Sequence, residues 1–293
     1  MDNKFPGKDI TSDDLKNKFP LSSSLKKKRI VKISNKVSFG GNQFPVIAGP
    51  NTIENRDMFF KCCEFMEKNK LHLLRAAIYK PLTFPYRSKK YFELGDSGLK
   101  ILQEVKKNFD VLLVSEIMDS DKISDMIDLI DVFQIGSRNM QNYSLLKKIA
   151  KTCKPVLLKR HYGSSLRDLL GAAEYILLED NPNVILCERG IVAPHTHRAT
   201  SRFILDIQAI PAIKESSCLP VISDPSHACF WHKWVGPLAL ASLAVGAEGL
   251  MIEFHPNPRK AAVDPLQAIG FSEFSSLLKK LKKIASFFGK KVA

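Results

Sequence analysis

The sequence predicts a single (β/α)8 barrel of the TIM type, with a short N-terminal extension and a β-hairpin in front of it. Eight short apolar runs alternate along the chain with eight amphipathic helical patterns, as expected for parallel strands joined by helical crossovers. The runs are almost continuously apolar, which is typical of strands buried on both faces. A closed sheet of eight such strands leaves no edge exposed. A doubly wound open sheet is the alternative, but no GxGxxG motif follows any run to favour it.

Two segments precede the first barrel strand. Residues 1–30 are polar and rich in lysine, with little apolar periodicity, so we expect an N-terminal arm or a short helix. Residues 29–44 alternate apolar and polar side chains around a Gly-Gly break, a pattern that indicates a hairpin. The remainder, residues 31–293, is predicted to form one catalytic domain without a second one.

The strands and helices of the barrel are then predicted in order. The strand runs lie at residues 44–50, 71–80, 111–118, 132–138, 155–161, 184–191, 219–227 and 249–255. The helical patterns lie at residues 55–69, 96–108, 120–130, 143–152, 165–180, 204–215, 234–247 and 272–288.

The composition narrows the class of protein. Apolar residues make up 45% of the chain and charged residues 25%, as in ordinary globular proteins. No apolar run is long enough to span a membrane, and the N-terminal residues have no secretory h-region. The six cysteines show no CxxC spacing, so we expect reduced thiols and a cytoplasmic protein. The net charge of +14 comes from lysines spread along the chain, which is typical of solvated helix faces and does not indicate a nucleic-acid binder. A basic field that attracts anionic, phosphorylated substrates is the functional alternative.

Polar and charged residues follow every predicted strand. In a (β/α)8 barrel the carboxyl ends of the strands carry the functional site. Cations lie at four of these ends, which predicts a pocket for a compact anion, because Arg and Lys suit phosphate and carboxylate groups. The residues at the strand ends are Asn51, Arg75, Lys80, Glu116, Arg138, Lys159, Arg160, Glu188, Arg189, Asp224, His227, Glu253 and His255.

A second group of residues has the chemistry of metal ligands. His227, Glu253 and Asp264 offer one imidazole and two carboxylates, which suit a divalent cation. A buried histidine that is hydrogen-bonded to an acid has the same composition. Both interpretations stay open on spacing alone.

A series of motifs carries a family resemblance. GPNTIEN, RAAIYKPLTFPY, QIGSRN, LLKR, NPNVILCERGI, LPVISDPSHA, GAEGLMIEFHPNP and DPLQ follow one another in this order. The series resembles the 3-deoxy-D-arabino-heptulosonate 7-phosphate (DAHP) synthases, and in particular their short type Iβ branch, over residues 30–280. The related 3-deoxy-octulosonate 8-phosphate synthases share the fold and the mechanism.

The resemblance implies a function and a set of site residues. The family condenses phosphoenolpyruvate with erythrose 4-phosphate and releases phosphate, at the first step of the shikimate pathway to the aromatic amino acids. Lys80 and His227 are the implied catalytic residues, with Lys80 as the general acid at the aldehyde oxygen. The implied phosphoenolpyruvate site consists of Arg75, Lys80, Arg138, Lys159, Arg189 and His227.

The sequence departs from the family at the metal site. The family binds a divalent metal such as Mn²⁺ with a Cys in a GPC motif and with the residues that match His227, Glu253 and Asp264. This chain has GPN, with Asn51 in place of the Cys, as in the metal-independent octulosonate synthases. An amide is a poor ligand for a transition metal, so we expect weak or no metal dependence. The alternative is a hard cation held by the three remaining ligands.

The second departure concerns the acceptor. Leu82 stands where the family has the Arg that grips the phosphate of erythrose 4-phosphate, and Phe84 replaces a Ser. The predicted acceptor contacts are therefore Thr83, Arg87, Lys89, Arg198 and Arg202. Trp231 and Trp234 are predicted either to line that pocket or to pack beneath a loop or at a subunit contact.

Three hypotheses follow for the activity. The first is condensation of phosphoenolpyruvate with erythrose 4-phosphate. The second is the same chemistry on a different aldehyde, as in octulosonate synthesis or specialised metabolism. The third is a barrel that binds phosphoenolpyruvate without catalysis, against which the presence of Lys80 argues. By analogy with the family we expect a homodimer or a homotetramer.

Overall fold

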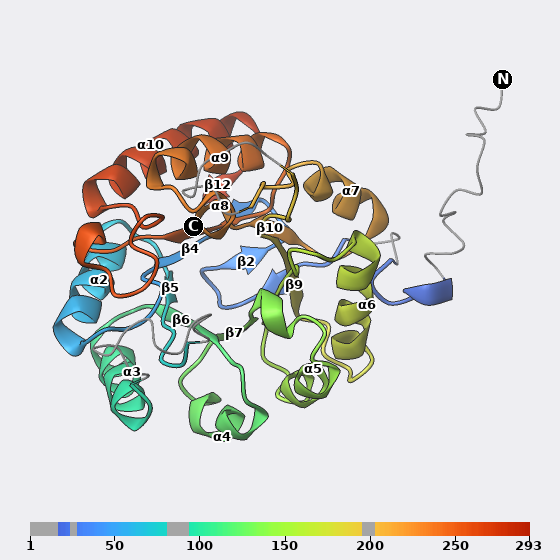
Figure 1. Ribbon diagram of the computed structural model, residues 1–293, viewed down its shortest axis with the longest axis horizontal. Coiled ribbons are helices and arrows are strands. Elements are labelled where there is room, and N and C mark those ends of the chain that lie inside the picture. Colours follow the sequence, from blue (N-terminus) through green and yellow to red (C-terminus); the bar gives the residue numbers. More distant parts are fainter. Residues whose placement is uncertain (1–16, 24–27, 81–93, 195–202) are drawn as a thin grey trace.

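The computed structural model describes residues 17–23, 28–80, 94–194 and 203–293 of the chain (Figure 1). Eight parallel strands close into a barrel in the order β10-β11-β4-β5-β6-β7-β8-β9, which confirms the predicted fold class. These strands are β4 (Val46–Gly49), β5 (Leu73–Arg75), β6 (Leu112–Glu116), β7 (Val132–Ile135), β8 (Val156–Lys159), β9 (Val184–Glu188), β10 (Val221–Ser223) and β11 (Leu250–Glu253).

Each barrel strand lies inside one of the predicted apolar runs, and almost all of its residues are buried. Alternate side chains face opposite sides of the sheet. In β4, Ile47 belongs to the cluster that fills the barrel, whereas Val46 and Ala48 belong to the cluster between the sheet and the helices. Burial on both faces explains why the runs are continuously apolar.

Helices surround the barrel, as Figure 1 shows. They are α2 (Arg56–Lys68), α3 (Asp96–Asn108), α4 (Ile123–Met126), α5 (Tyr143–Ala150), α6 (Leu166–Leu177), α7 (Ala209–Ser216), α9 (His232–Ala244) and α10 (Phe271–Phe287). The third helical pattern forms only the 3₁₀ turn η1 (Ser120–Lys122) and the single turn α4. Only residues 117–131 connect β6 to β7, which leaves little room for a longer helix.

One short helix was not predicted. The helix α8 (Pro225–Cys229) follows β10 directly. Asp224 accepts a hydrogen bond from the backbone N–H of His227 and so caps the helix, and Pro225 occupies the first turn, a position that tolerates proline. The helix ends at Phe230, whose φ of 55° is left-handed.

The predicted hairpin is present. Strands β1 (Val31–Lys32) and β2 (Ser38–Phe39) pair antiparallel, and Val31, Val37 and Phe39 join the cluster inside the barrel. The hairpin therefore covers one end of the barrel. The pairing of β3 (Gln43–Phe44) with β12 (Lys291–Val292) was not predicted, because two-residue strands carry no readable alternation.

Part of the N-terminal arm is described, and it packs on the barrel. The backbone N–H of Ser22 donates to Glu174 Oε1 at 2.6 Å, and the N–H of Cys218 donates to the Ser22 carbonyl at 2.8 Å. Residues 17–23 thus connect α6 with the segment before β10. The domain boundary at residue 30 stays a prediction. Among the described residues no helix is long and apolar enough to cross a membrane.

Candidate active site at the carboxyl ends of the barrel strands

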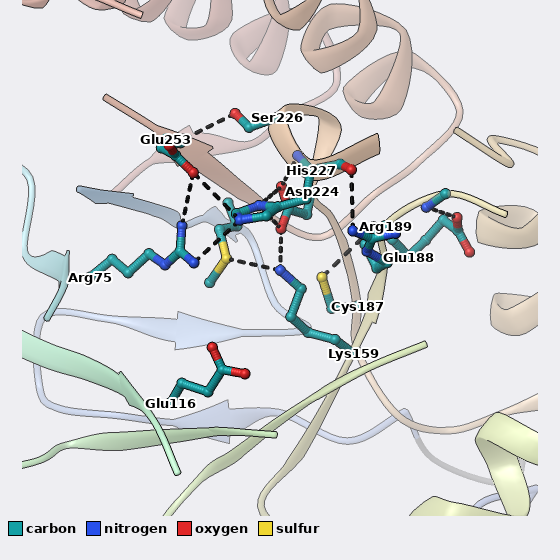
Figure 2. A network of polar contacts seen from close by, with 12 residues as sticks. Arg75, Glu116, Lys159, Cys187, Glu188, Arg189, Asp224, Ser226, His227 and Glu253 are labelled. Carbon is teal, nitrogen blue, oxygen red and sulfur yellow. Dashed lines mark hydrogen bonds and ion pairs between the residues drawn. The ribbon is translucent and has the colours of Figure 1, made fainter. Parts of the chain in front are cut away.

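The carboxyl ends of the strands bring together most of the charged residues that the sequence places there (Figure 2). Arg75, Glu188 and Glu253 are the last residues of β5, β9 and β11, and all three are almost fully buried. Buried ionised groups are stable only with partners. The site is therefore built as a network of ion pairs.

His227 lies at the centre of this network. Its Nδ1 is 2.8 Å from Oδ2 of Asp224, and the same carboxylate accepts a hydrogen bond from Lys159 Nζ. Burial lowers the pKa of His227 well below its usual value, and Lys159 and Arg75 add to this effect. Burial works to raise the pKa of Asp224, but His227 and Lys159 together hold that pKa well below its usual range. The site thus presents a neutral imidazole beside an ionised carboxylate.

Arg75 points into a ring of acceptors from three other elements, as Figure 2 shows for two of them. Its Nη1 donates to Glu253 Oε2 at 3.3 Å, and its Nη2 donates to Asn51 Oδ1 at 3.3 Å. Nη2 also lies 3.3 Å from His227 Nε2. Burial raises the pKa of Glu253 to about 7, although Arg75 acts in the opposite direction.

Gly49 explains how Asn51 reaches Arg75. The residue has a φ of +153°, and a Cβ at this position would lie 2.8 Å from the backbone oxygen of Arg75. Only glycine allows the two strands to approach so closely. Asn51 follows two residues later, so that its side chain stands beside the guanidinium.

Lys80 and Glu116 form a second pair. Lys80 Nζ lies 3.5 Å from Glu116 Oε2, and both side chains are largely buried. Burial lowers the pKa of Lys80 to about 8, against the opposing effect of Glu116. Gly136 leaves space for the carboxylate, since a Cβ there would lie 1.9 Å from Glu116 Oε1. A lysine with this pKa is protonated at neutral pH and still able to release its proton.

The two remaining predicted anion contacts differ in exposure. Arg189 is buried, donates to the His227 carbonyl at 3.2 Å, and lies over the ring of Phe203 at 4.2 Å. Arg138 belongs to the 3₁₀ turn η2 (Ser137–Asn139) after β7 and is exposed. Arg75 and Arg189 therefore contact His227 directly, and Lys159 is joined to it through Asp224. Arg138 lies at the surface.

One ion-pair network contains a residue that the sequence did not indicate. Arg160 Nη1 donates to Glu188 Oε2 and to Asp206 Oδ2, each at 2.9 Å. Burial raises the pKa of Glu188, whose other oxygen accepts from the N–H of Gly190 at 2.6 Å. Asp206 precedes α7 and follows no strand, so its position in the sequence gave no signal.

The predicted metal ligands lie near one another. His227 Nε2 is 3.4 Å from Glu253 Oε2, and Asn51 Nδ2 donates to Asp264 Oδ2 at 3.2 Å. Gln267, which the DPLQ motif could have indicated, donates to Glu253 Oε2 at 2.6 Å. Within the described parts of the chain, no group of three or more His, Cys, Asp and Glu side chains has the arrangement of a metal site.

The predicted acceptor contacts cannot be placed in the same way. Thr83, Arg87, Lys89, Arg198 and Arg202, together with Leu82 and Phe84, lie outside the described residues. Trp231 stands at the N-terminal end of α9, and the exposed fraction of Trp234 is 38%. Their part in an acceptor pocket stays a prediction.

The geometry defines what the site can do chemically. Rigidly paired cations at neighbouring strand ends can bind a small anion with phosphate and carboxylate groups. A protonated lysine near them can supply a proton to a developing alkoxide. The neutral imidazole can accept a hydrogen bond. Together these groups suit an addition reaction between an anionic donor and a carbonyl compound.

Comparisons with known proteins agree with this chemistry. Residues 28–288 match the DAHP synthetase I family. The phospho-2-dehydro-3-deoxyheptonate aldolase of Thermotoga maritima is 39% identical over 256 residues, which cover 87% of this chain and 74% of that protein. The 2-dehydro-3-deoxyphosphooctonate aldolase of Syntrophobacter fumaroxidans is 27% identical over 260 residues, which cover 84% of this chain and 88% of that protein.

Solved structures give the same result. The crystal structure of the Thermotoga maritima phospho-2-dehydro-3-deoxyheptonate aldolase (DAHP synthase) has a TM-score of 0.84 and 36% identity, and the match covers 91% of this chain and 76% of that one. A truncated form of the Thermotoga maritima synthase also has a TM-score of 0.84, with 35% identity, covering 94% of this chain and 100% of its own.

Proposed function

The chain belongs to the DAHP synthetase I family, and we propose on this basis that it condenses phosphoenolpyruvate with erythrose 4-phosphate. The products are DAHP and inorganic phosphate, at the first step of the shikimate pathway. The protein is accordingly a transferase that forms a carbon–carbon bond. The observation that carries the proposal is the convergence of Arg75, Lys159 and Arg189 on His227 and Asp224 at the strand ends, with Lys80 close enough to Arg75 for that charge to lower the pKa of the lysine.

Donor binding uses the cations that remain beside Arg75. Lys159 is fixed by Asp224, and Arg189 is fixed against the His227 carbonyl. Because their positions are set before the substrate arrives, they hold the phosphate and the carboxylate of phosphoenolpyruvate with little reorganisation. Arg138 is exposed and supplies a further contact from the rim.

The reaction proceeds by attack of the phosphoenolpyruvate methylene carbon on the aldehyde carbon. Lys80 donates its proton to the aldehyde oxygen as the new carbon–carbon bond forms. Positive charge develops at the enol carbon, water adds there, and the proton that the added water loses restores the protonated state of Lys80. The resulting hemiketal phosphate breaks its carbon–oxygen bond to phosphate, which leaves the 2-keto group of the product. Glu116, 3.5 Å from Lys80 Nζ, stabilises the protonated lysine before the transfer.

The divalent metal of the family does not fit the donors present. Asn51 offers an amide where the family has a thiolate. The guanidinium of Arg75 is already bonded to Asn51 and Glu253 and faces His227 Nε2. We therefore propose that the chain requires no Mn²⁺ or similar metal, and we assign no step of the reaction to one.

The acceptor has a second candidate. Leu82 and Phe84 replace the polar residues of the family's acceptor motif, and the relative from Syntrophobacter fumaroxidans is named for an octonate rather than a heptonate. This favours an alternative in which the same chemistry takes a longer or less charged aldehyde. Erythrose 4-phosphate remains the first proposal because the more similar relative is a heptonate aldolase.

Phosphate release from phosphoenolpyruvate tests the proposal. The full chain is assayed with erythrose 4-phosphate, arabinose 5-phosphate and unphosphorylated aldoses, each with EDTA and with added Mn²⁺. We expect turnover with erythrose 4-phosphate that survives EDTA. Lys80→Met abolishes it, whereas Lys106→Met in α3, an exposed lysine paired with Asp131, does not. Turnover only with another aldehyde would show that erythrose 4-phosphate is not the acceptor. Tight phosphoenolpyruvate binding without turnover would refute the enzymatic function.

The cysteines of the protein bear on its cellular compartment. All six cysteines lie in the described part of the chain and are free, which is typical of proteins from a reducing compartment. We propose a cytoplasmic enzyme that acts on small molecules. The homodimer or homotetramer expected by analogy is to be checked by sedimentation equilibrium.

A further inference from the structure

The side chain of Arg75 occupies the middle of the predicted metal ligands. Its two terminal nitrogens each lie 3.3 Å from a ligand atom, Glu253 Oε2 for Nη1 and both Asn51 Oδ1 and His227 Nε2 for Nη2. The exposed fraction of Arg75 is only 2%. Arginine stays protonated in proteins, so a permanent positive charge stands among the atoms that would coordinate a metal.

Asn51 is matched to this arrangement. Its Oδ1 accepts from Arg75, and its Nδ2 donates to Asp264 Oδ2 at 3.2 Å. A side-chain amide has both an acceptor and donors, and here both are used, so that Asn51 links the guanidinium to the carboxylate of Asp264. A cysteine thiolate has no donor for Asp264.

His227 presents the correct nitrogen to the guanidinium. Nδ1 faces Asp224, so it carries the proton and Nε2 keeps its lone pair. That lone pair points to Arg75 Nη2. A carboxylate behind Nδ1 and a cation in front of Nε2 is the arrangement found around histidine ligands of metals. In this chain the cation in front is a side chain.

Glu253 is held in the same array from several directions. Gln267 donates to Oε2 at 2.6 Å. Figure 2 shows the other two contacts: Arg75 donates to the same oxygen, and the backbone N–H of Glu253 donates to Ser226 Oγ at 2.9 Å. The carboxylate oxygen nearest to His227 is therefore already engaged by two donors. A metal ion would have to displace both of them.

We propose that Arg75 is the resident cation of this site and that Arg75 and Asn51 together take the place of the family's metal. The guanidinium holds Asn51, His227 and Glu253 at fixed positions, and Asn51 extends this order to Asp264. Arg75 is thus a positioning residue whose cation cannot be removed by a chelator. The consequence for catalysis depends on the proposed function, whereas the exclusion of metal does not.

The test measures metal binding to the full chain without substrate. Co²⁺ is titrated into wild type, Arg75→Met, Asn51→Cys and the double variant Asn51→Cys/Arg75→Met, and bound metal is followed by equilibrium dialysis and visible absorption. We expect no stoichiometric binding by wild type and one Co²⁺ per chain with a thiolate-to-cobalt band in the double variant. Removal of Arg75 should tighten binding roughly a hundredfold or more relative to Asn51→Cys alone, because repulsion at contact distance disappears.

The outcomes separate the two proposals. One Co²⁺ bound per wild-type chain, with no gain on removing Arg75, overturns the resident cation. Arg75→Lys keeps a positive charge at this position and serves as a folding control. Thermal unfolding of every variant is measured with and without Co²⁺. The metal should raise the Tm only of the variants that lack the cation at position 75. A wild-type chain that neither binds Co²⁺ nor turns over any aldehyde leaves this inference standing and refutes the proposed activity.

Discussion

The carboxylate of Asp224 lies between His227 Nδ1, at 2.8 Å from Oδ2, and the ammonium of Lys159. Asp224 also accepts from the backbone N–H of His227 as the cap of α8. One buried carboxylate thus sets the tautomer of the histidine, fixes a predicted donor contact and starts the helix that carries the histidine.

Asp224→Asn tests this relationship. The amide oxygen can still cap α8, but the negative charge that orders His227 and Lys159 is lost. We expect kcat to fall roughly a hundredfold, as for carboxylates that orient site histidines, and the free energy of unfolding to fall by about 3–5 kcal/mol, because Lys159 stays buried without its anion. Glu248→Gln is the matched control, because this buried acid accepts only from the N–H of Val221 among its described contacts, and it should leave kcat within about twofold.

The proposed role of Lys80 as the general acid predicts that the activity depends on pH. The lysine must be protonated to act as an acid, and its pKa is about 8. Activity is therefore complete below that pH and is lost as the pH rises through about 8. Glu116 raises the pKa of Lys80, so Glu116→Gln should move the alkaline limb of kcat to lower pH by about one unit. Asp131→Asn, which removes the carboxylate that pairs with Lys106, should leave the limb in place.

Gly49→Ala tests the close approach of β4 and β5. The new Cβ would meet the backbone of Arg75 at 2.8 Å and adopt an unfavourable φ, so we expect a loss of about 3 kcal/mol in the free energy of unfolding. Gly289→Ala has a φ of +67° with nothing within 4 Å and should cost only about 1 kcal/mol. If urea unfolding gave the same loss of unfolding free energy for both variants, the steric contact at Gly49 would be unimportant.

The Arg160 network should contribute mainly to stability. Arg160→Met leaves Glu188 buried without its cation, which typically costs about 3–5 kcal/mol. The double variant Arg160→Met/Glu188→Gln should recover part of that loss, since no buried charge remains. Asp206 is 23% exposed, so Asp206→Asn should cost less than about 1 kcal/mol. A double variant as unstable as Arg160→Met would contradict the ion-pair explanation.

The barrel could be predicted from the sequence because each strand is buried on both faces and is therefore a continuous apolar run. The sequence was also sufficient for the position of Lys80, His227 and Glu253, since parallel strands bring their carboxyl ends to one rim. It could not give the partners of Arg75, which lie 24, 152 and 178 residues away along the chain. The sequence did not indicate α8 or the β3–β12 pair, because these elements are too short to show a hydrophobic periodicity. It did not indicate Asp206 either, because this residue lies in the connection before α7 and not at the end of a strand.

The barrel closes through the pairing of β4 with β11, whose partners Gly49 and Glu253 lie at opposite ends of the domain sequence. About 200 residues must therefore be synthesised after β4 before its second edge is paired, which takes roughly 10–40 s at ordinary rates of translation. During that time the growing sheet presents unpaired N–H and C=O groups that can pair with another chain. Nascent chains of this protein are consequently expected to depend on chaperones during synthesis, and crowding of ribosomes on its message should lower the yield of native enzyme.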